Sequence, residues 1–136
     1  MNRKLLVSIG VILLIATINS FSKEKSENIK IMYFHATERC QGCLALEGNV
    51  VKSVNELYET ELKAEMYNYD SIDFLAEENE KFVELYKIET QTLIISKVVD
   101  GKEVKWINLD KIWDYAGSYP KMKKYIDREM KKLLKS

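Results

Sequence analysis

Residue types from which metal and nucleotide sites are built are scarce in this chain of 136 residues. It contains two cysteines, one histidine, one proline and five glycines. A structural zinc site needs four ligands, mostly Cys or His, and the chain has no second CxxC motif or Cys/His pair to complete one. A Gly-rich nucleotide-binding fingerprint is missing too. We therefore expect neither a bound cofactor nor a zinc site.

The chain also lacks an excess of either charge, with 21 basic and 21 acidic residues. Arg3 and Lys4 are the only charged residues before position 23, so 19 basic residues remain beyond that point against 21 acidic ones. A nucleic-acid-binding domain usually carries a net basic surface. The basic residues near the C-terminus alternate with apolar ones at helical spacing, as on a solvated helix face. We expect no nucleic-acid partner.

The apolar run near the N-terminus is shorter than the about 20 residues of a membrane-spanning helix. It covers Leu5–Ile18, follows the basic residues Arg3 and Lys4, and precedes two small residues, Ser20 and Ser22. This pattern is typical of a secretory signal cleaved after Ser22. We expect residues 1–22 to be a signal peptide or, if they are retained, a membrane anchor through residues 4–20.

The remaining chain has the length of one domain. We expect a linker over residues 23–28 and a folded domain over residues 29–136. Behind an export signal this domain would lie outside the cytosol, in the periplasm or another extracytoplasmic compartment. Disulfides persist in such compartments, so the state of the two cysteines becomes central.

Both cysteines belong to one motif, Cys40–Gln41–Gly42–Cys43, which lies between an apolar run and a helix-like segment. A thiol at a helix N-terminus meets unpaired N–H groups and the positive end of the helix dipole. Both favour the thiolate, which is the form that attacks disulfides. We predict a reversible dithiol/disulfide pair in which Cys40 is the exposed nucleophile and Cys43 the more buried resolving thiol.

Two other interpretations of the motif stay open. A CxxC disulfide closes so short a loop that it stabilises a fold only weakly through chain entropy, yet it could still be inert. Two thiolates could also bind or transfer a soft metal, with His35 as a third ligand. A histidine at a strand end is, however, more often held by ordinary hydrogen bonds.

Hydrophobic periodicity predicts the order strand, helix, strand, helix, strand, strand, helix. In the first helix Leu46, Val50 and Val54 face inward, and Glu47 is expected on the other side. Asp100–Gly101 predicts a tight hairpin turn. The expected strands are Lys30–His35, Ala64–Tyr69, Leu93–Val99 and Glu103–Ile107, and the expected helical segments are Leu44–Leu62, Ser71–Tyr86, Asn108–Tyr115 and a last helix that begins after Ser118.

This order, with a CxxC between the first strand and its helix, resembles the thioredoxin superfamily over roughly residues 29–135. The resemblance implies an α/β fold with a central mixed four-stranded sheet flanked by helices. The segments 33–43 (YFHATERCQGC) and 108–113 (NLDKIW) more narrowly resemble small exported bacterial proteins labelled as nitrophenyl-compound nitroreductase subunits. Because no flavin-binding fingerprint is present, we take that label as a name and not as an activity.

The resemblance also implies positions that dock substrate or tune the cysteines. Gln91, after Thr90, stands where thioredoxins carry a cis-proline that faces the disulfide and helps to dock partner peptides. A cis bond before a non-proline residue costs about 2.5–4 kcal/mol, so we expect a trans bond here. Gln41 and Gly42 form the dipeptide that tunes the redox potential in this fold.

Two further positions depart from the family. Arg39 replaces the tryptophan before the first cysteine, and its guanidinium either favours the Cys40 thiolate by charge or points to water. Phe34 stands where a buried acid is expected, so proton transfer from Cys43 needs another group or water.

Together these features predict an exported thiol–disulfide oxidoreductase or electron-relay protein. Its partners would be a protein or small-molecule disulfide and a redox protein that regenerates the dithiol. A non-catalytic binding module or accessory subunit of the same fold, and a soft-metal-binding protein, are the alternatives.

Overall fold

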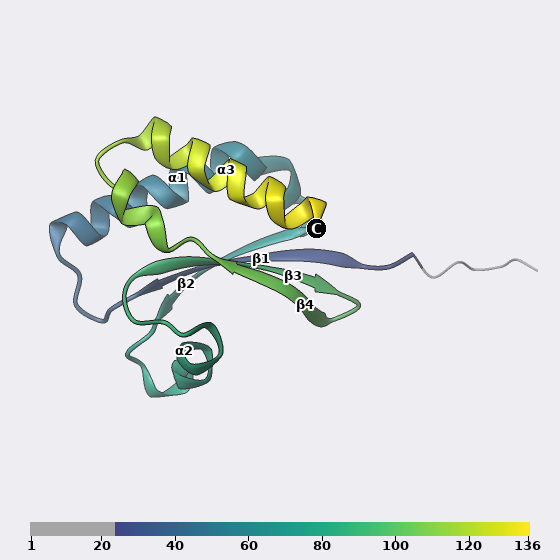
Figure 1. Cartoon of the computed structure of the whole chain (residues 1–136), viewed down its shortest axis with the longest axis horizontal. Helices are drawn as coiled ribbons and strands as arrows, with labels where there is room; N and C mark the ends of the chain where they lie inside the picture. The colour runs from purple at the N-terminus through teal and green to yellow at the C-terminus, as the bar shows by residue number, and fades with distance from the viewer. Residues whose placement is uncertain (1–23) are drawn as a thin grey trace, which may run out of the picture.

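A computed structural model describes residues 24–136, which form a four-stranded sheet with the strand order β2-β1-β3-β4. Helices α1 and α3 cover one face of this sheet and α2 covers part of the other (Figure 1). In chain order the elements are β1 (Glu27–His35), α1 (Gln41–Lys63), β2 (Tyr67–Asp73), the 3-10 segment η1 (Glu77–Asn79), α2 (Glu80–Tyr86), β3 (Thr92–Val99), β4 (Lys102–Asn108), the 3-10 segment η2 (Asp110–Tyr115) and α3 (Tyr119–Lys135).

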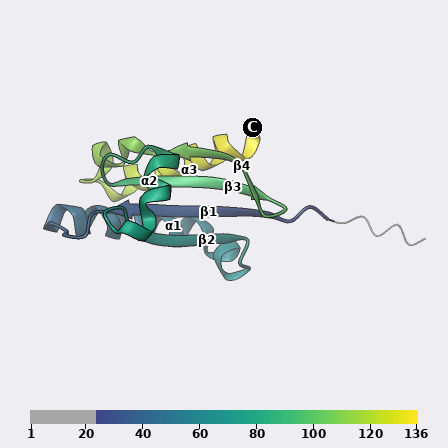
Figure 2. The same cartoon turned by 90° about the horizontal axis from the view of Figure 1, so that it is seen from below.

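The sheet is mixed, because β1 runs parallel to β2 and antiparallel to β3, which in turn is antiparallel to β4. Figure 2, seen from below, shows the four strands side by side with α2 across them. A parallel strand–helix–strand unit followed by a hairpin and a last helix is the thioredoxin-like fold, with the CxxC at the start of α1. The predicted fold class is confirmed.

The expected signal or anchor, residues 1–22 with the apolar segment 4–20, lies outside the described residues. Between residues 24 and 136, no helix is both long and apolar enough to cross a membrane. The expected linker is partly wrong, because β1 begins at Glu27. Glu27 and Asn28 pair with Val99 and Val98 of β3 and so belong to the sheet.

Strand β1 is central, and its side chains are buried on both faces as the sequence predicts. Ile29, Ile31 and Tyr33 face α1 and α3, whereas Met32 and Phe34 face α2. Side chains of successive strand residues point to opposite faces, so a strand covered by helices on both sides needs an unbroken apolar run.

The second strand lies further along the chain than expected, at Tyr67–Asp73 instead of Ala64–Tyr69. Ser71, where we expected the second helix to begin, pairs with Tyr33 of β1, and the preceding Asp70 pairs with Met32. β2 is an edge strand, so it needs only one paired side and accepts polar residues. Its position is therefore set by pairing with β1 and not by its own pattern.

The second helix is shorter than expected. Residues 71–73 belong to β2, and only Glu80–Tyr86 is α-helical after η1. Lys87 ends α2 in the left-handed conformation, with φ 52°. The predicted hairpin is confirmed, since Asp100 and Gly101 both have positive φ, 51° and 78°, as a type I′ turn requires. Likewise, η2 is the first helical piece expected after β4, wound as a 3-10 helix.

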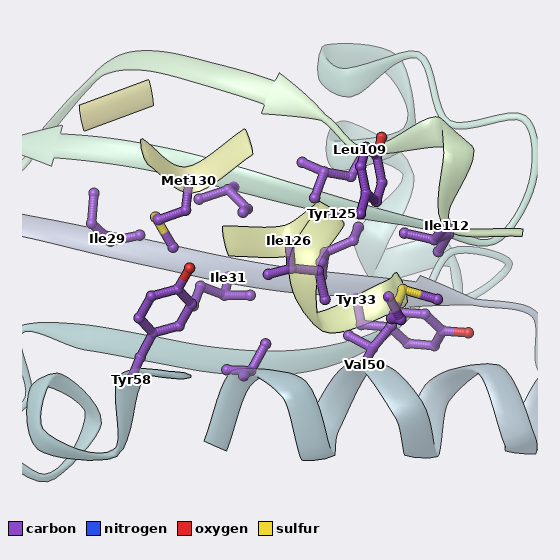
Figure 3. Packing of buried hydrophobic residues seen from close by; sticks show 14 of the residues in the cluster. Ile29, Ile31, Tyr33, Val50, Tyr58, Leu109, Ile112, Tyr125, Ile126 and Met130 are labelled. Carbon is purple, nitrogen blue, oxygen red and sulfur yellow. The ribbon is translucent and has the colours of Figure 1, made fainter. Parts of the chain in front are cut away.

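Two hydrophobic cores lie on the two faces of the sheet. The larger core fills the space between the sheet and helices α1 and α3 (Figure 3). Val50 of α1, Ile31 of β1 and Ile126 of α3 meet there, each no more than 1% exposed. The smaller core, beneath α2, comprises Met32, Phe34, Tyr86, Ile88 and Ile94. Helix α1, which carries the CxxC, thus rests on the larger core.

Candidate functional site

Cys40 and Cys43 form a disulfide at the start of α1, with their Cα atoms 5.0 Å apart. Cys40 is the N-cap residue of the helix, with extended backbone angles of φ −74° and ψ 165°. It is exposed, whereas Cys43, in the first turn, is half-buried. Cys40 is therefore the more exposed residue of the pair.

The Cys40 sulfur takes the place of a capping oxygen. The backbone N–H of Cys43 donates a hydrogen bond to Cys40 Sγ over 3.1 Å, in the position where Ser or Asp side chains usually cap a helix. When the disulfide is reduced, this N–H group and the helix dipole favour negative charge on Cys40. The helix start thus favours the nucleophilic form of this residue.

The loop before the motif is tied to the end of β2. Thr37 hydrogen-bonds the carboxylate of Asp73, which lowers the pKa of Asp73, and the N–H of Phe74 donates to the carbonyl of His35 over 2.9 Å. His35 is buried, and its Nδ1 lies 2.9 Å from the carbonyl oxygen of Ala36. These contacts hold the end of β1 and the turn that leads to Cys40.

The Arg39 side chain does not point freely to water. Its Nη1 donates to Glu47 Oε2, and the Ser71 hydroxyl of β2 donates to Glu47 Oε1 over 2.6 Å. The Glu47 side chain is only 14% exposed, so its expected place on the outer face of α1 is wrong. Spacing could have revealed it, because Glu47 follows Cys43 by four residues and adjoins the buried Leu46.

Two tyrosines lie close enough to Glu47 to feel its charge. The pKa of Tyr33 on β1 and that of Tyr69 on β2 are raised, mainly by burial and next by the negative charge of Glu47. The Tyr69 hydroxyl is buried and has no hydrogen-bond partner among the described residues. A partly enclosed polar cluster therefore lies between the start of α1 and strands β1 and β2.

Gln91 occupies the expected place immediately before β3. It is buried, its side-chain oxygen accepts a hydrogen bond from the Tyr33 hydroxyl over 2.9 Å, and its carbonyl oxygen accepts one from Trp113 Nε1 over 3.2 Å. No peptide bond between residues 24 and 136 is cis, so the expected trans bond is confirmed. The preceding residue, Thr90, is exposed.

Strand register places Gln91 at the CxxC end of the sheet. Phe34 pairs with Thr92, so Gln91 lies beside the end of β1, from which the chain continues into the loop before α1 (Figure 1). Phe34 itself faces α2, on the opposite side from the cysteines. Tyr33 is the β1 residue nearest this end that packs in the core under α1 and α3, and the apolar pattern of the strand does not distinguish it from its neighbours.

Gln41 and Gly42, between the cysteines, are exposed. A Cβ atom on Gly42 would lie 3.8 Å from Cys40 Sγ, an ordinary contact distance. The turn therefore does not require glycine for space. Within the described part of the chain, no three His, Cys, Asp or Glu residues are grouped so that they could hold a metal ion.

Comparisons with known proteins give fold-level similarity only. No protein-family model matches the chain, and a search of curated proteins finds no significant match. Among solved structures, the chain is similar to the germline-specific thioredoxin Deadhead of Drosophila melanogaster, with 21% identity, a TM-score of 0.40 and coverage of 59% of this chain and 67% of that one.

Two further solved structures show similarity of the same order. Fasciola hepatica thioredoxin has 20% identity and a TM-score of 0.37, with coverage of 68% of this chain and 81% of that one. A malarial protein has 16% identity and a TM-score of 0.38, with coverage of 59% and 79%. Because these TM-scores lie below 0.5, we base the fold class on the strand order and helix placement of this chain itself.

Proposed function

We propose that this protein is an exported thiol–disulfide oxidoreductase or electron-relay protein that works through reversible oxidation of Cys40 and Cys43. The observation that carries the proposal is the position of Cys40. It is an exposed N-cap residue whose sulfur accepts the Cys43 N–H, and it is paired with a half-buried second cysteine. Export is proposed from the signal-like residues 1–22.

The reaction transfers two electrons from the dithiol to a partner disulfide. The Cys40 thiolate attacks one sulfur of the partner, forms a mixed disulfide and releases the first partner thiolate. Cys43 then loses its thiol proton and attacks Cys40 Sγ, which restores the Cys40–Cys43 bond and releases the second partner thiolate. A second redox protein has to return two electrons and two protons to the disulfide for another cycle.

The surroundings of the motif favour a protein disulfide over a small molecule. Leu44, directly after Cys43, is 52% exposed, and Trp113, which hydrogen-bonds Gln91, is 39% exposed. Exposed apolar side chains beside a reactive group provide contact area for a polypeptide partner.

A redox titration tests the proposal. We expect the full chain, equilibrated in glutathione buffers and scored by thiol alkylation, to show a reversible transition between about −120 and −270 mV, the range of working oxidoreductases. A pair that stays oxidised to below about −300 mV would behave as a structural disulfide and would contradict the proposal.

Trapping identifies the nucleophile. Cys43→Ser leaves Cys40 without its resolving thiol, so we expect this variant to accumulate a mixed disulfide with its partner. The matched variant Cys40→Ser should trap none, because Cys43 is the less accessible sulfur. Equal trapping by both variants would contradict the assigned roles.

One observation favours a second candidate, a non-catalytic binding module or accessory subunit. In the thioredoxins that this chain resembles, the residue at position 91 helps to dock partner peptides, but here the Gln91 carbonyl is engaged by Trp113. If this candidate is right, the double variant Cys40→Ser/Cys43→Ser will keep its partner. An oxidoreductase variant of this kind would lose its covalent complex and its turnover.

A further inference from the structure

Glu47 and Cys43 lie on the same face of α1. They are four residues apart, and side chains at this spacing lie one above the other on a helix. Helical side chains lean toward the helix N-terminus, and the Glu47 carboxylate meets Arg39, which precedes the helix. The carboxylate is thus directed toward the turn that holds Cys43.

The position of this carboxylate is held from outside the helix. Arg39 from the loop engages Oε2, and Ser71 from β2 engages Oε1. A carboxylate offers about four acceptor sites, so these two hydrogen bonds leave capacity for another donor. Cys43 is half-buried at the start of the same helix.

The charged and titratable groups that face Glu47 come from three elements. Arg39 is the cation, and Tyr33 and Tyr69 are phenols whose pKa values are raised by burial. Asp70 lies near Tyr69, and Asp73 lies within the field of Arg39. Neutral phenols and a guanidinium donate hydrogen bonds and do not accept a thiol proton at neutral pH. Glu47 is the group in this cluster suited to accept one.

We propose that Glu47 accepts the proton of the Cys43 thiol as Cys43 attacks the mixed disulfide. The inference rests on the proposed function. In this step the S–H bond of Cys43 breaks, its proton passes to Glu47 directly or through one water, a Cys43–Cys40 bond forms, and the bond from Cys40 to the partner breaks. The partner sulfur leaves as a thiolate with the electron pair. Arg39 and Ser71 are positioning residues.

A chromogenic disulfide separates the two steps. When the reduced full chain is mixed with 5,5′-dithiobis(2-nitrobenzoate), attack by Cys40 releases one thionitrobenzoate and attack by Cys43 on the mixed disulfide releases a second. We expect Glu47→Gln to slow the second release about tenfold at pH 7, a modest general-base effect, without slowing the first. At pH 9.5, where hydroxide ionises the thiol, the rates of the second release in Glu47→Gln and in the unmodified chain should differ by less than about twofold.

Three further variants keep the test independent of folding. Ser71→Ala keeps the carboxylate and removes one of its hydrogen bonds, so we expect a smaller slowing of the second release than in Glu47→Gln. Glu59→Gln is the matched control, because Glu59 is an exposed glutamate of the same helix that pairs with Lys63, and both releases should keep their unmodified rates. If Glu47→Gln does not fold, Glu47→Asp replaces it, because it retains a carboxylate on a shorter side chain. Its second release should approach the rate of the unmodified chain at pH 9.5.

The outcomes distinguish the inference from the function on which it rests. A second release that is unchanged or faster in Glu47→Gln at pH 7 overturns the inference, because Glu47 would then act on Cys43 only through its negative charge. Equal slowing at pH 7 and pH 9.5 also overturns it, because that is the result of a structural role. If the unmodified chain shows no first release at all, the proposed function itself fails.

Discussion

The two faces of the sheet differ in how completely helices cover them. Among residues 24–136, sixteen buried residues form the core under α1 and α3, whereas five form the core under α2. The CxxC lies on the first of these helices, so its backbone is anchored in the larger core. The comparison indicates that the geometry of the site depends on one face much more than on the other.

The smaller core, which has fewer buried residues, is rich in aromatic rings. Phe34, Phe82, Tyr86 and Trp106 contact one another with ring centroids 5.1–6.3 Å apart. Large rings bury much area per residue, so a helix of seven residues is enough to cover them. Leu85 on the same helix remains 51% exposed, which shows that the cover is partial.

Truncation of one core side chain on each face should give the largest difference in stability between the two faces of the sheet. We expect Ile126→Ala to lower the free energy of unfolding by about 3–5 kcal/mol and Ile88→Ala by about 2–3 kcal/mol. Ile126 is 0% exposed in the larger core, whereas Ile88 is 6% exposed after α2, where its neighbours can move to fill the cavity. Urea unfolding of both variants measures this difference. Equal losses would show that the α2 face supports the fold as strongly as the α1 face.

Removal of single hydroxyl groups tests the same comparison through hydrogen bonds. Tyr33→Phe leaves the buried oxygen of Gln91 without its donor, so we expect a loss of about 1–3 kcal/mol. Tyr86→Phe, on the α2 face, removes a hydrogen bond to Glu103, which keeps its bond from Ser96. We expect a smaller loss there, below about 1 kcal/mol.

Thermal or urea unfolding of Tyr33→Phe and Tyr86→Phe measures the two losses of stability. A larger loss in Tyr86→Phe than in Tyr33→Phe would reverse the order of the two faces.

The smallest expected effect concerns the exposed contact between α1 and α3. Glu56 accepts hydrogen bonds from Lys123 and Tyr119, and these lower its pKa. A lowered carboxyl pKa stabilises the fold above the ordinary glutamate value of about 4.3, and that stability is lost as the pH falls through the folded value. The Tm of Glu56→Gln should therefore be slightly below that of the unmodified chain at pH 7, and this difference should shrink toward pH 3.

Salt should shrink the pH 7 difference as well, because the pair is exposed. Glu84→Gln, at an exposed position on α2, serves as the control and should leave the Tm unchanged at both pH values. A Glu56→Gln difference in Tm that is as large at pH 3 as at pH 7 would mean that the contact acts through packing.

Regular local patterns predicted much of the fold. The apolar run of β1, the three- and four-residue spacing in α1 and α3, and the Asp100–Gly101 turn are confirmed, because each depends on neighbours in sequence. β2 lies further along the chain than its own pattern predicts, because a polar edge strand takes its register from β1. The second helix is shorter than its pattern predicts, because its apolar residues do not reveal where pairing with β1 ends.

The candidate site divides in the same way. The sequence alone determined that two cysteines stand at the start of a helix behind a buried strand, because motif, spacing and helix signal are all local. Only the tertiary structure decided what surrounds them. Glu47 meets Ser71 across 24 residues and Tyr33 meets Gln91 across 58, and such contacts exist only once β1, β2 and β3 lie side by side. The motif alone indicates the chemistry of the two sulfur atoms. The polar and charged groups around them come together only when the sheet forms.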